Sequence, residues 1–76
     1  MSTLNDLRQV GQKGRVVDVT GDDAVAVRLM EMGLIDGVEI ELLGFAPLGD
    51  PIEFLVRGYR LSLRQAEAKR VAIELV

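Results

Sequence analysis

The stretch from Gly37 to Leu63, "GVEIELLGFAPLGDPIEFLVRGYRLSL", decides the fold. Apolar residues recur at every second position there in three successive groups: Val38, Ile40 and Leu42; Ile52, Phe54 and Val56; Leu61 and Leu63. Side chains of a β-strand alternate between its two faces, so this period of two predicts three consecutive antiparallel strands, each with one buried face. We expect a tight link at Gly58-Tyr59 to join the second strand to the third.

Both prolines of the chain, Pro47 and Pro51, lie between the first and second of these strands. Proline has a fixed backbone φ and no N–H to donate to a sheet, so strand pairing is confined to the flanks of the connection. Gly49 and Asp50 supply the turn between the prolines. The sequence therefore predicts a stiff hairpin that sets the strand register and presents Leu48 at its tip.

The residues before this stretch predict a first strand. "GRVVDVTG", Gly14–Gly21, is rich in β-branched residues and is bracketed by glycines. Val17 and Val19 alternate around Asp18, but Val16 interrupts the pattern, which indicates either a bulge or burial on both faces.

The period then changes from that of a strand to that of a helix in "DDAVAVRLMEMGL", residues 22–34. Val25, Leu29 and Met32 follow one helical stripe. Asp22 and Asp23 suit the first turn, where carboxylates accept hydrogen bonds from free backbone amides. Gly33 suits the end of the helix, since it adopts a left-handed conformation easily, and Leu34 is placed to fold back on the last turn.

At the end of the chain, "RQAEAKR", residues 64–70, allows one or two helical turns, and alternating apolar residues from Val71 to Leu75 predict a last short strand. Five short strands with one α-helix after the first predict a mainly β domain, a small closed or nearly closed barrel. With 76 residues, the chain is expected to form a single domain, residues 1–76.

Composition argues against an enzyme and against a dedicated metal site. The chain has no cysteine and no histidine, which removes the usual ligands of zinc, copper and iron and the common nucleophile and base pairs. Asp22, Asp23, Asp36 and Asp50 offer oxygen ligands for a hard cation, but their places beside glycines or at the helix start favour turn and cap roles. We therefore expect no catalytic residue, no metal ligand and no cofactor.

Charge and hydropathy restrict the partners. The net charge of −3 argues against a nucleic-acid partner, because phosphate affinity comes chiefly from clustered lysine and arginine. A single glycine followed by two acids, in "VTGDDAVAVR", does not make a phosphate-binding loop. No apolar run approaches the roughly 20 residues that span a bilayer, and the N-terminus lacks a signal pattern, so we expect a cytoplasmic protein that does not insert into a membrane.

Residues outside the core pattern are the candidates for contact with a partner protein. Met30, Leu43, Phe45, Leu48 and Leu55 are apolar but lie off the inward stripes, and a cluster of such residues marks an interface. Arginines on the last hairpin either form a basic docking patch or pair with Glu53 and Glu41 on a solvated face. The candidate partner-binding residues are Met30, Phe45, Pro47, Leu48, Leu55, Arg57, Arg60 and Arg64.

Four motifs resemble the FeoA family of ferrous iron transport accessory proteins. They are Leu29-x-x-Met32-Gly33-Leu34-x-x-Gly37, Ala46-Pro47-Leu48-Gly49-Asp50-Pro51, Arg57-Gly58, and Leu61-x-Leu63-Arg64-x-x-Glu67-Ala68. Together with a weaker match from Leu7 to Val19, the resemblance covers almost the whole chain.

The resemblance implies an SH3-like barrel of five strands with a helix inserted after the first. It also implies a cytoplasmic, non-catalytic protein that binds FeoB, a membrane permease with a cytosolic GTPase domain, and modulates ferrous iron uptake by protein contact. An alternative is a metal-responsive regulatory module, because the same SH3-like module resembles the C-terminal domain of iron-dependent repressors. The sequence leaves a weak homo-oligomer open.

Overall fold

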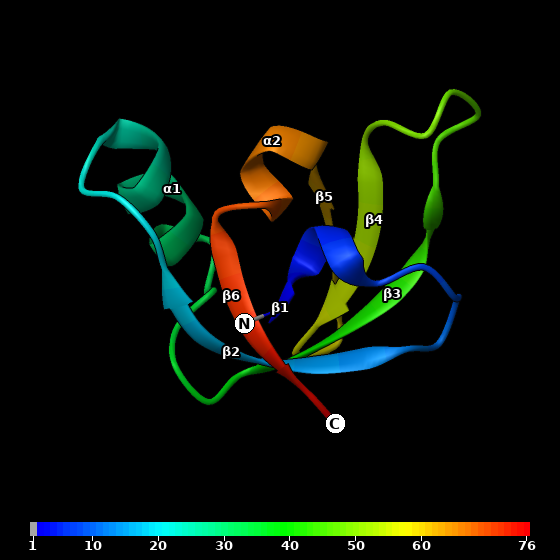
Figure 1. Ribbon diagram of the computed structural model, residues 1–76, viewed down its shortest axis with the longest axis horizontal. Helices are drawn as coiled ribbons and strands as arrows, with labels where there is room; N and C mark the ends of the chain where they lie inside the picture. Colours follow the sequence, from blue (N-terminus) through cyan, green and yellow to red (C-terminus); the bar gives the residue numbers. More distant parts are fainter. Residues whose placement is uncertain (1) are drawn as a thin grey trace.

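The computed structural model describes residues 2–76, and six strands form one antiparallel sheet in the order β1-β6-β2-β3-β4-β5 (Figure 1). The strands are β1 (Ser2–Thr3), β2 (Lys13–Val19), β3 (Glu39–Phe45), β4 (Ile52–Val56), β5 (Tyr59–Leu63) and β6 (Val71–Leu75). Five of them are the predicted strands. The sixth, β1, pairs with β6 over only two residues, which is too short for any alternation to be read from the sequence.

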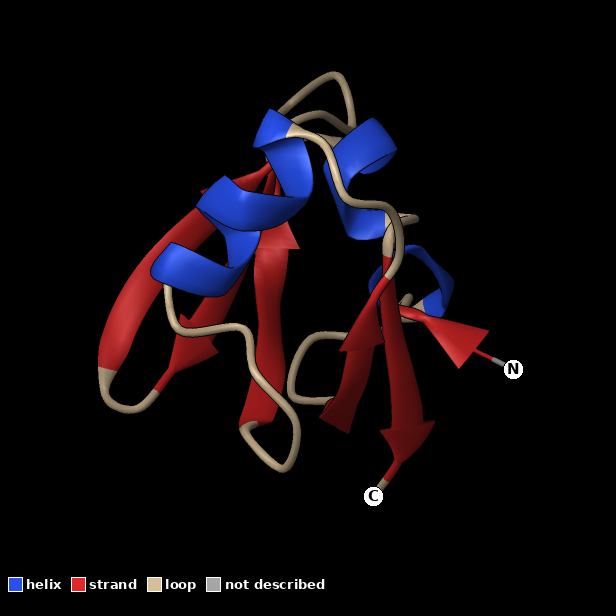
Figure 2. Ribbon diagram, turned by 90° about the vertical axis from the view of Figure 1, so that its left-hand side faces the viewer, coloured by secondary structure: helices blue, strands red, loops and turns tan. Residues whose placement is uncertain are grey.

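Three short helical segments accompany the sheet: η1 (Leu4–Asp6), α1 (Ala24–Glu31) and α2 (Gln65–Ala68). They gather along one side of the curved sheet (Figure 2). Within residues 2–76 the edge strands β1 and β5 are not paired with each other, and η1 and α2 contribute buried side chains on the open side of the barrel. No helix in this described part of the chain has the length and apolar character needed to cross a bilayer.

A single aliphatic core fills the space between sheet and helices. Its members include Leu4 and Leu7 around η1, Leu29 of α1, and Phe54 of β4, which are all fully buried. The alternating positions predicted from the sequence supply most of the rest: Val38, Ile40, Leu42, Ile52, Val56, Leu61, Leu63, Val71 and Ile73.

A β-bulge in β2 explains the irregular run of valines. The register of β2 against β6 shifts between Val16 and Asp18, so Val17 is an extra residue. Val16 and Val19 are therefore both buried although their spacing is odd. A second shift, between Leu42 and Gly44 of β3, turns the end of that strand toward the hairpin.

Helix α1 begins and ends as its sequence predicts. The Asp23 carboxylate accepts a hydrogen bond from the Ala26 amide at 3.1 Å. At the other end Gly33 has φ +100°, and the Leu34 amide donates to the Leu29 carbonyl at 3.3 Å, which folds the chain back over the last turn. The buried face is shifted from the predicted stripe: Ala26 and Leu29 enter the core, while Val25 and Met32 are only partly buried and pack against its edge.

The link between β4 and β5 lies one residue earlier than predicted. Arg57 and Gly58 form the turn, with φ of +50° and +84°, and Tyr59 already begins β5. Two positive φ values are the geometry of a two-residue hairpin turn that follows the twist of its strands. Glycine adopts a positive φ easily, but arginine seldom does, so nothing in the sequence indicates that Arg57 belongs to the turn.

Candidate protein-interaction site

The connection between β3 and β4, residues 46–51, forms a hairpin tip that presents Leu48 to solvent. Leu48 is 96% exposed, the most exposed of the large hydrophobic residues. The tip is closed by two backbone hydrogen bonds, from the Ala46 amide to the Pro51 carbonyl at 3.0 Å and from the Gly49 amide to the Ala46 carbonyl at 2.7 Å. The Asp50-Pro51 peptide bond is cis. The hairpin projects from the body of the molecule (Figure 1), which leaves the Leu48 side chain almost fully exposed.

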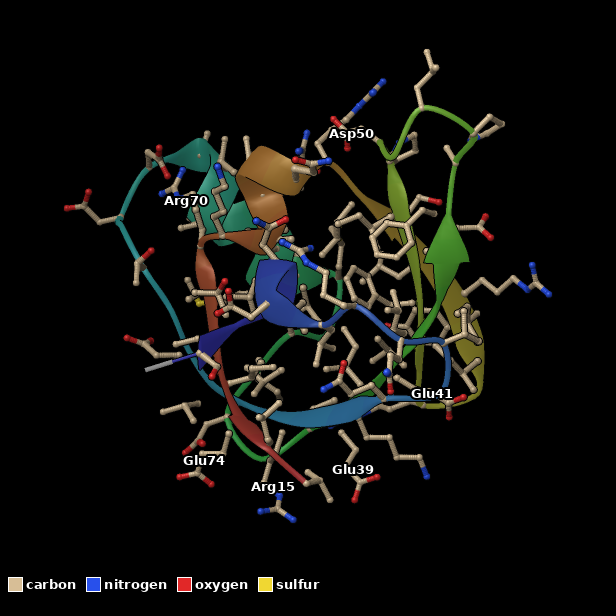
Figure 3. The ribbon with its side chains drawn as sticks, turned by 45° about the vertical axis from the view of Figure 1, so that its right-hand side comes forward. Arg15, Glu39, Glu41, Asp50, Arg70 and Glu74 are labelled. Atoms are coloured by element: carbon tan, nitrogen blue, oxygen red, sulfur yellow. The ribbon has the colours of Figure 1, made fainter. Side chains whose placement is uncertain are left out.

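Contacts with the start of α2 fix the tip to the barrel. The Gln65 amide donates to the Asp50 carboxylate at 2.9 Å, and the Gln65 side-chain amide donates to the Gly49 carbonyl at 3.0 Å. Arg64 lies 4.0 Å from the other Asp50 oxygen and keeps 66% of its side chain exposed. Asp50 lies at the base of the tip in Figure 3. These contacts join residues about 15 positions apart, and nothing in the local sequence predicts them.

The predicted partner-binding residues do not form one patch. Phe45, Pro47, Leu48 and Arg64 lie at the hairpin end, Leu55 and Arg57 on the outer sheet face, and Met30 on α1. Arg57 and Arg64 flank opposite ends of β5, and a strand of this length separates them by about 17 Å. Arg60 pairs with Glu53 at 3.7 Å, as the solvated-face alternative predicted. Of the two alternatives left open by the sequence, the Arg60–Glu53 pair favours the solvated, charge-paired face.

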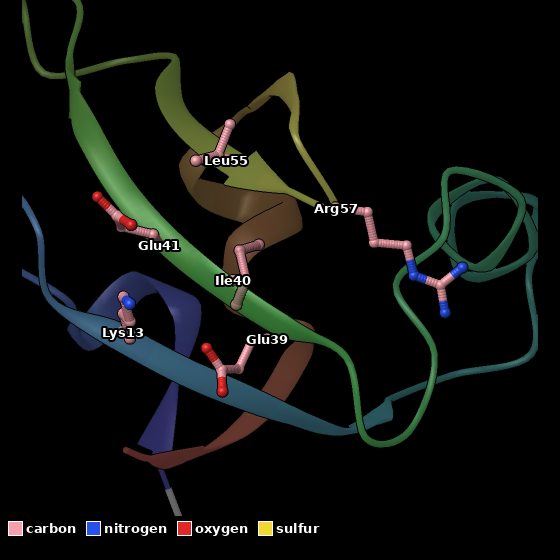
Figure 4. A pocket seen from close by; sticks show the side chains of 6 residues that line it. All are labelled: Lys13, Glu39, Ile40, Glu41, Leu55 and Arg57. Atoms are coloured by element: carbon pink, nitrogen blue, oxygen red, sulfur yellow. The ribbon is translucent and has the colours of Figure 1, made fainter.

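A hollow of about 220 Å³ on the outer sheet face carries balanced charges (Figure 4). Its lining residues are Lys13, Glu39, Ile40, Glu41, Leu55 and Arg57. Lys13 lies directly across from Glu41 in the β2–β3 register, and Arg57 points away from both carboxylates. Opposite charges across neighbouring strands stabilise a sheet. We interpret this hollow as part of a solvated, charge-paired face.

The same charge pairing continues along the outer face of β2. Arg15 lies across from Glu39 on β3 and 3.9 Å from Glu74 on β6, and Figure 3 shows the three side chains together. A central cation between two carboxylates leaves little net charge for a charged ligand to recognise.

A second hollow, of about 130 Å³, lies between β2 and α1. We call it the α1 groove; it is lined by Val17, Asp18, Val19, Met30, Leu34, Ile35 and Asp36. Met30 and Ile35 are 42% and 46% exposed, and both border this apolar depression. Sequence analysis selected Met30 but missed Ile35, because Ile35 follows the helix end and belongs to no periodic stripe.

An arginine clamp fixes α1 to the barrel next to this groove. The guanidinium of Arg70 binds both carboxylate oxygens of Asp23, at 2.6 and 3.0 Å, and donates to the Thr20 carbonyl at 3.0 Å. The Arg70 hydrogen bonds, together with the Ala26 amide, lower the pKa of Asp23 from 3.8 to about 2, and the carboxylate raises the pKa of Arg70. A bidentate pair of this kind fixes geometry as well as charge.

This clamp predicts an acid-sensitive contribution to folding. The folded-state pKa of Asp23 lies below the unfolded value, so the stabilisation is complete above about pH 4 and is lost as the pH falls toward about 2. We expect Asp23→Asn, which keeps a capping side chain, to flatten the fall of the melting temperature between pH 4 and 2. Thermal unfolding followed by circular dichroism measures this. Asp22→Asn, one residue earlier, is the control, and identical acid profiles for wild type and Asp23→Asn would contradict the role given to the clamp.

Aspartates act here as caps and turn residues. Asp23 and Asp50 accept backbone hydrogen bonds at the starts of α1 and α2. Over residues 2–76 no three side chains of His, Cys, Asp or Glu come together in a way that would hold a metal ion. Two apolar features stand out on the described surface: an exposed leucine on an anchored tip, and an apolar groove bordered by acids.

The family model and the curated relative that match this chain belong to the same family. The FeoA domain family matches residues 3–75. A fusion protein of Fe(2+) transport protein A and the Fe(2+) transporter FeoB from Porphyromonas gingivalis is 33% identical over 66 residues, which cover 87% of this chain. This chain spans only 8% of the length of that relative.

Solved structures agree with the sequence match. The solution structure of FeoA from Chlorobium tepidum is 37% identical with a TM-score of 0.88, over 99% of this chain and 70% of that one. FeoA of Stenotrophomonas maltophilia, complexed with zinc and described as a prokaryotic SH3 domain protein, is 33% identical with a TM-score of 0.84, over 97% of this chain and 91% of that one. These likenesses confirm the predicted SH3-like fold.

The likeness to repressors is more distant. The structure of the manganese regulator SloR has a TM-score of 0.81 but only 20% sequence identity. The matched region covers 99% of this chain and 34% of the SloR chain, and at this identity it shows the shared fold alone. The family match over nearly the whole chain and the 33% identity to the fused transport protein carry the assignment. This chain belongs to the FeoA domain family.

Proposed function

We propose that this chain is a single, non-catalytic cytoplasmic domain that binds an FeoB-like membrane permease and modulates ferrous iron uptake by protein contact. The observation that carries the proposal is the Porphyromonas gingivalis relative, in which Fe(2+) transport protein A and FeoB are one polypeptide. A fusion keeps two domains at a high effective concentration for each other, which serves a protein whose two domains act on one another.

The hairpin tip is the surface that fits this role best. Leu48 is almost fully exposed, and its loop is anchored by Gln65 and Asp50, so little conformational freedom is lost when it docks. Arg64 beside it adds an exposed cation that suits an interface. Arginine is enriched among the residues that dominate binding energy at protein contacts, and the exposed leucine beside it would lose its whole apolar surface to water-free contact on docking.

Leu48→Ala tests this contact. We expect at least a tenfold weaker affinity for a purified FeoB-like permease or its cytosolic part, since a central anchor contributes more than any rim residue. The melting temperature should hardly change, because the side chain touches little of its own domain. Isothermal titration calorimetry or surface-based binding measures the affinity.

Val10→Ala is the matched control, because Val10 is also apolar and exposed, at 69%, on a different loop. Its affinity should equal that of the wild type. If Leu48→Ala bound as tightly as the wild type, the tip would be architecture only; if the wild-type chain formed no complex with any part of the permease, the proposed function itself would be wrong.

A further inference from the structure

The α1 groove has the size of one apolar side chain. Its volume of about 130 Å³ is well below the 300 to 1,000 Å³ typical of small-molecule sites. An apolar cavity of about 150 Å³ accepts a benzene molecule, which is comparable in bulk to a leucine side chain. Leu34 is fully buried beneath it, and Met30 and Ile35 border it. The groove therefore suits insertion of a single aliphatic residue rather than a metabolite.

The rim of the groove is acidic. Asp18 on β2 and Asp36 after α1 are both exposed and both line it. Within residues 2–76 neither carboxylate forms a salt bridge. An apolar residue that carries a cation beside it is thus the complementary occupant, because the cation gains from the two carboxylates and suffers no competition from an internal partner.

The hairpin tip of this same chain has that composition. It holds Leu48 at 96% exposure, and Arg64, which is two-thirds exposed, approaches the base of the tip at Asp50. The tip and α1 lie on opposite sides of the molecule in Figure 1, so they cannot meet within one chain.

We propose that the chain associates head to tail, with Leu48 of one copy inserted into the α1 groove of a second copy and Arg64 facing Asp18 and Asp36. Such a contact joins two different surfaces, so each copy keeps one free tip and one free groove, and the association grows into a ring or a short chain. A contact centred on one side chain buries less than a standard interface, so the self-association is weak and depends on concentration.

Complementation between two variants tests the proposal. Leu48→Asp removes the tip but keeps the groove, and Met30→Lys spoils the groove but keeps the tip. We expect wild-type chain to show a sedimentation coefficient that rises with concentration, and each variant alone to need at least a tenfold higher concentration for the same rise. An equimolar mixture of the two variants should recover association but stop at a dimer, because it contains one intact tip-and-groove pair per two chains.

Two further variants control for a folding defect and for a general effect of added charge. Ile35→Lys replaces Met30→Lys if the helix substitution lowers the melting temperature. Val10→Lys, on a loop that belongs to neither the tip nor the groove, is the control that should associate like the wild type. Wild-type chain that stays monomeric at millimolar concentration, or a mixture that stays as monomeric as its components, would overturn the proposal. The proposal would also be overturned if Leu48→Asp or Met30→Lys alone associated as strongly as the wild type.

Self-association is measured on this chain alone. A chain that stays monomeric would therefore not count against binding to the permease, and a chain that does not bind the permease would not count against self-association. If both contacts exist they share Leu48, and a saturating amount of the permease's cytosolic part should dissolve the head-to-tail species.

Discussion

Replacing Phe54 by alanine is expected to lower the free energy of unfolding by about 3 to 5 kcal/mol. Phe54 is fully buried in β4 and is the largest of the fully buried side chains. Removal of its ring loses apolar burial and leaves a cavity in the core, which β4 cannot easily close because it is hydrogen-bonded to β3 on one side and to β5 on the other. Small domains have only about 5 to 15 kcal/mol of stability in total, so this variant should be close to unfolding at 37 °C.

Phe45→Ala is the matched control, because Phe45 pairs with Ile52 on the neighbouring strand and is 40% exposed. The same chemical change there should cost less, since the partly exposed ring gained only part of its transfer free energy on folding and its removal leaves no closed cavity. Urea unfolding followed by circular dichroism gives both values. Similar losses for the two phenylalanines would show that the assigned core is wrong.

Gly14→Ala is expected to destabilise the fold by about 1 to 3 kcal/mol, although alanine normally suits a strand better than glycine. A Cβ at Gly14 would lie 2.6 Å from the Ile73 Cδ1 atom and 3.3 Å from its Cβ, because Ile73 on the paired strand β6 covers the glycine diagonally. The end of the isoleucine side chain must move, and the dense core gives it no free space.

A double variant tests the cause. Ile73→Val removes the Cδ1 atom, so Gly14→Ala should cost less in the Ile73→Val background than in the wild type, which a double-mutant cycle measures. Gly44→Ala is the control: a Cβ there meets no atom within 4 Å, and the change should be close to neutral or slightly stabilising. Additive effects at positions 14 and 73 would refute the close approach.

The shape of the hairpin tip could be predicted from the local sequence, but its anchoring could not. Two prolines around Gly49 and Asp50 predict a stiff turn with Leu48 at its end, and the structure confirms that arrangement. The anchoring by Gln65 could not be predicted, because it depends on where the start of α2 lies after the chain has passed through β4 and β5. Its role in partner binding stays a prediction.

The candidate surfaces, in contrast, could not be predicted from the local sequence. The sequence could not tell whether the apolar residues outside the core pattern adjoin, and Met30 and Leu55 in fact line different hollows. The α1 groove joins residues of β2, of α1 and of the connection after it, and its acidic rim comes from Asp18 and Asp36, which are 18 positions apart by their numbers. Neither residue has a local signal, since exposed aspartates near turns are common.

What the sequence alone determined is five of the six strands, the helix between Asp23 and Gly33, the capping of that helix, and the absence of residue types for common metal and nucleophile chemistry. Those features follow from the period of apolar residues and from backbone preferences, which act between near neighbours. Only the tertiary structure decided the short strand β1, the clamp of Arg70 on Asp23, and the places of the hairpin tip and the α1 groove on opposite sides. Each of these joins segments far apart in the chain, and their distance is set by the curvature and bulges of the whole sheet.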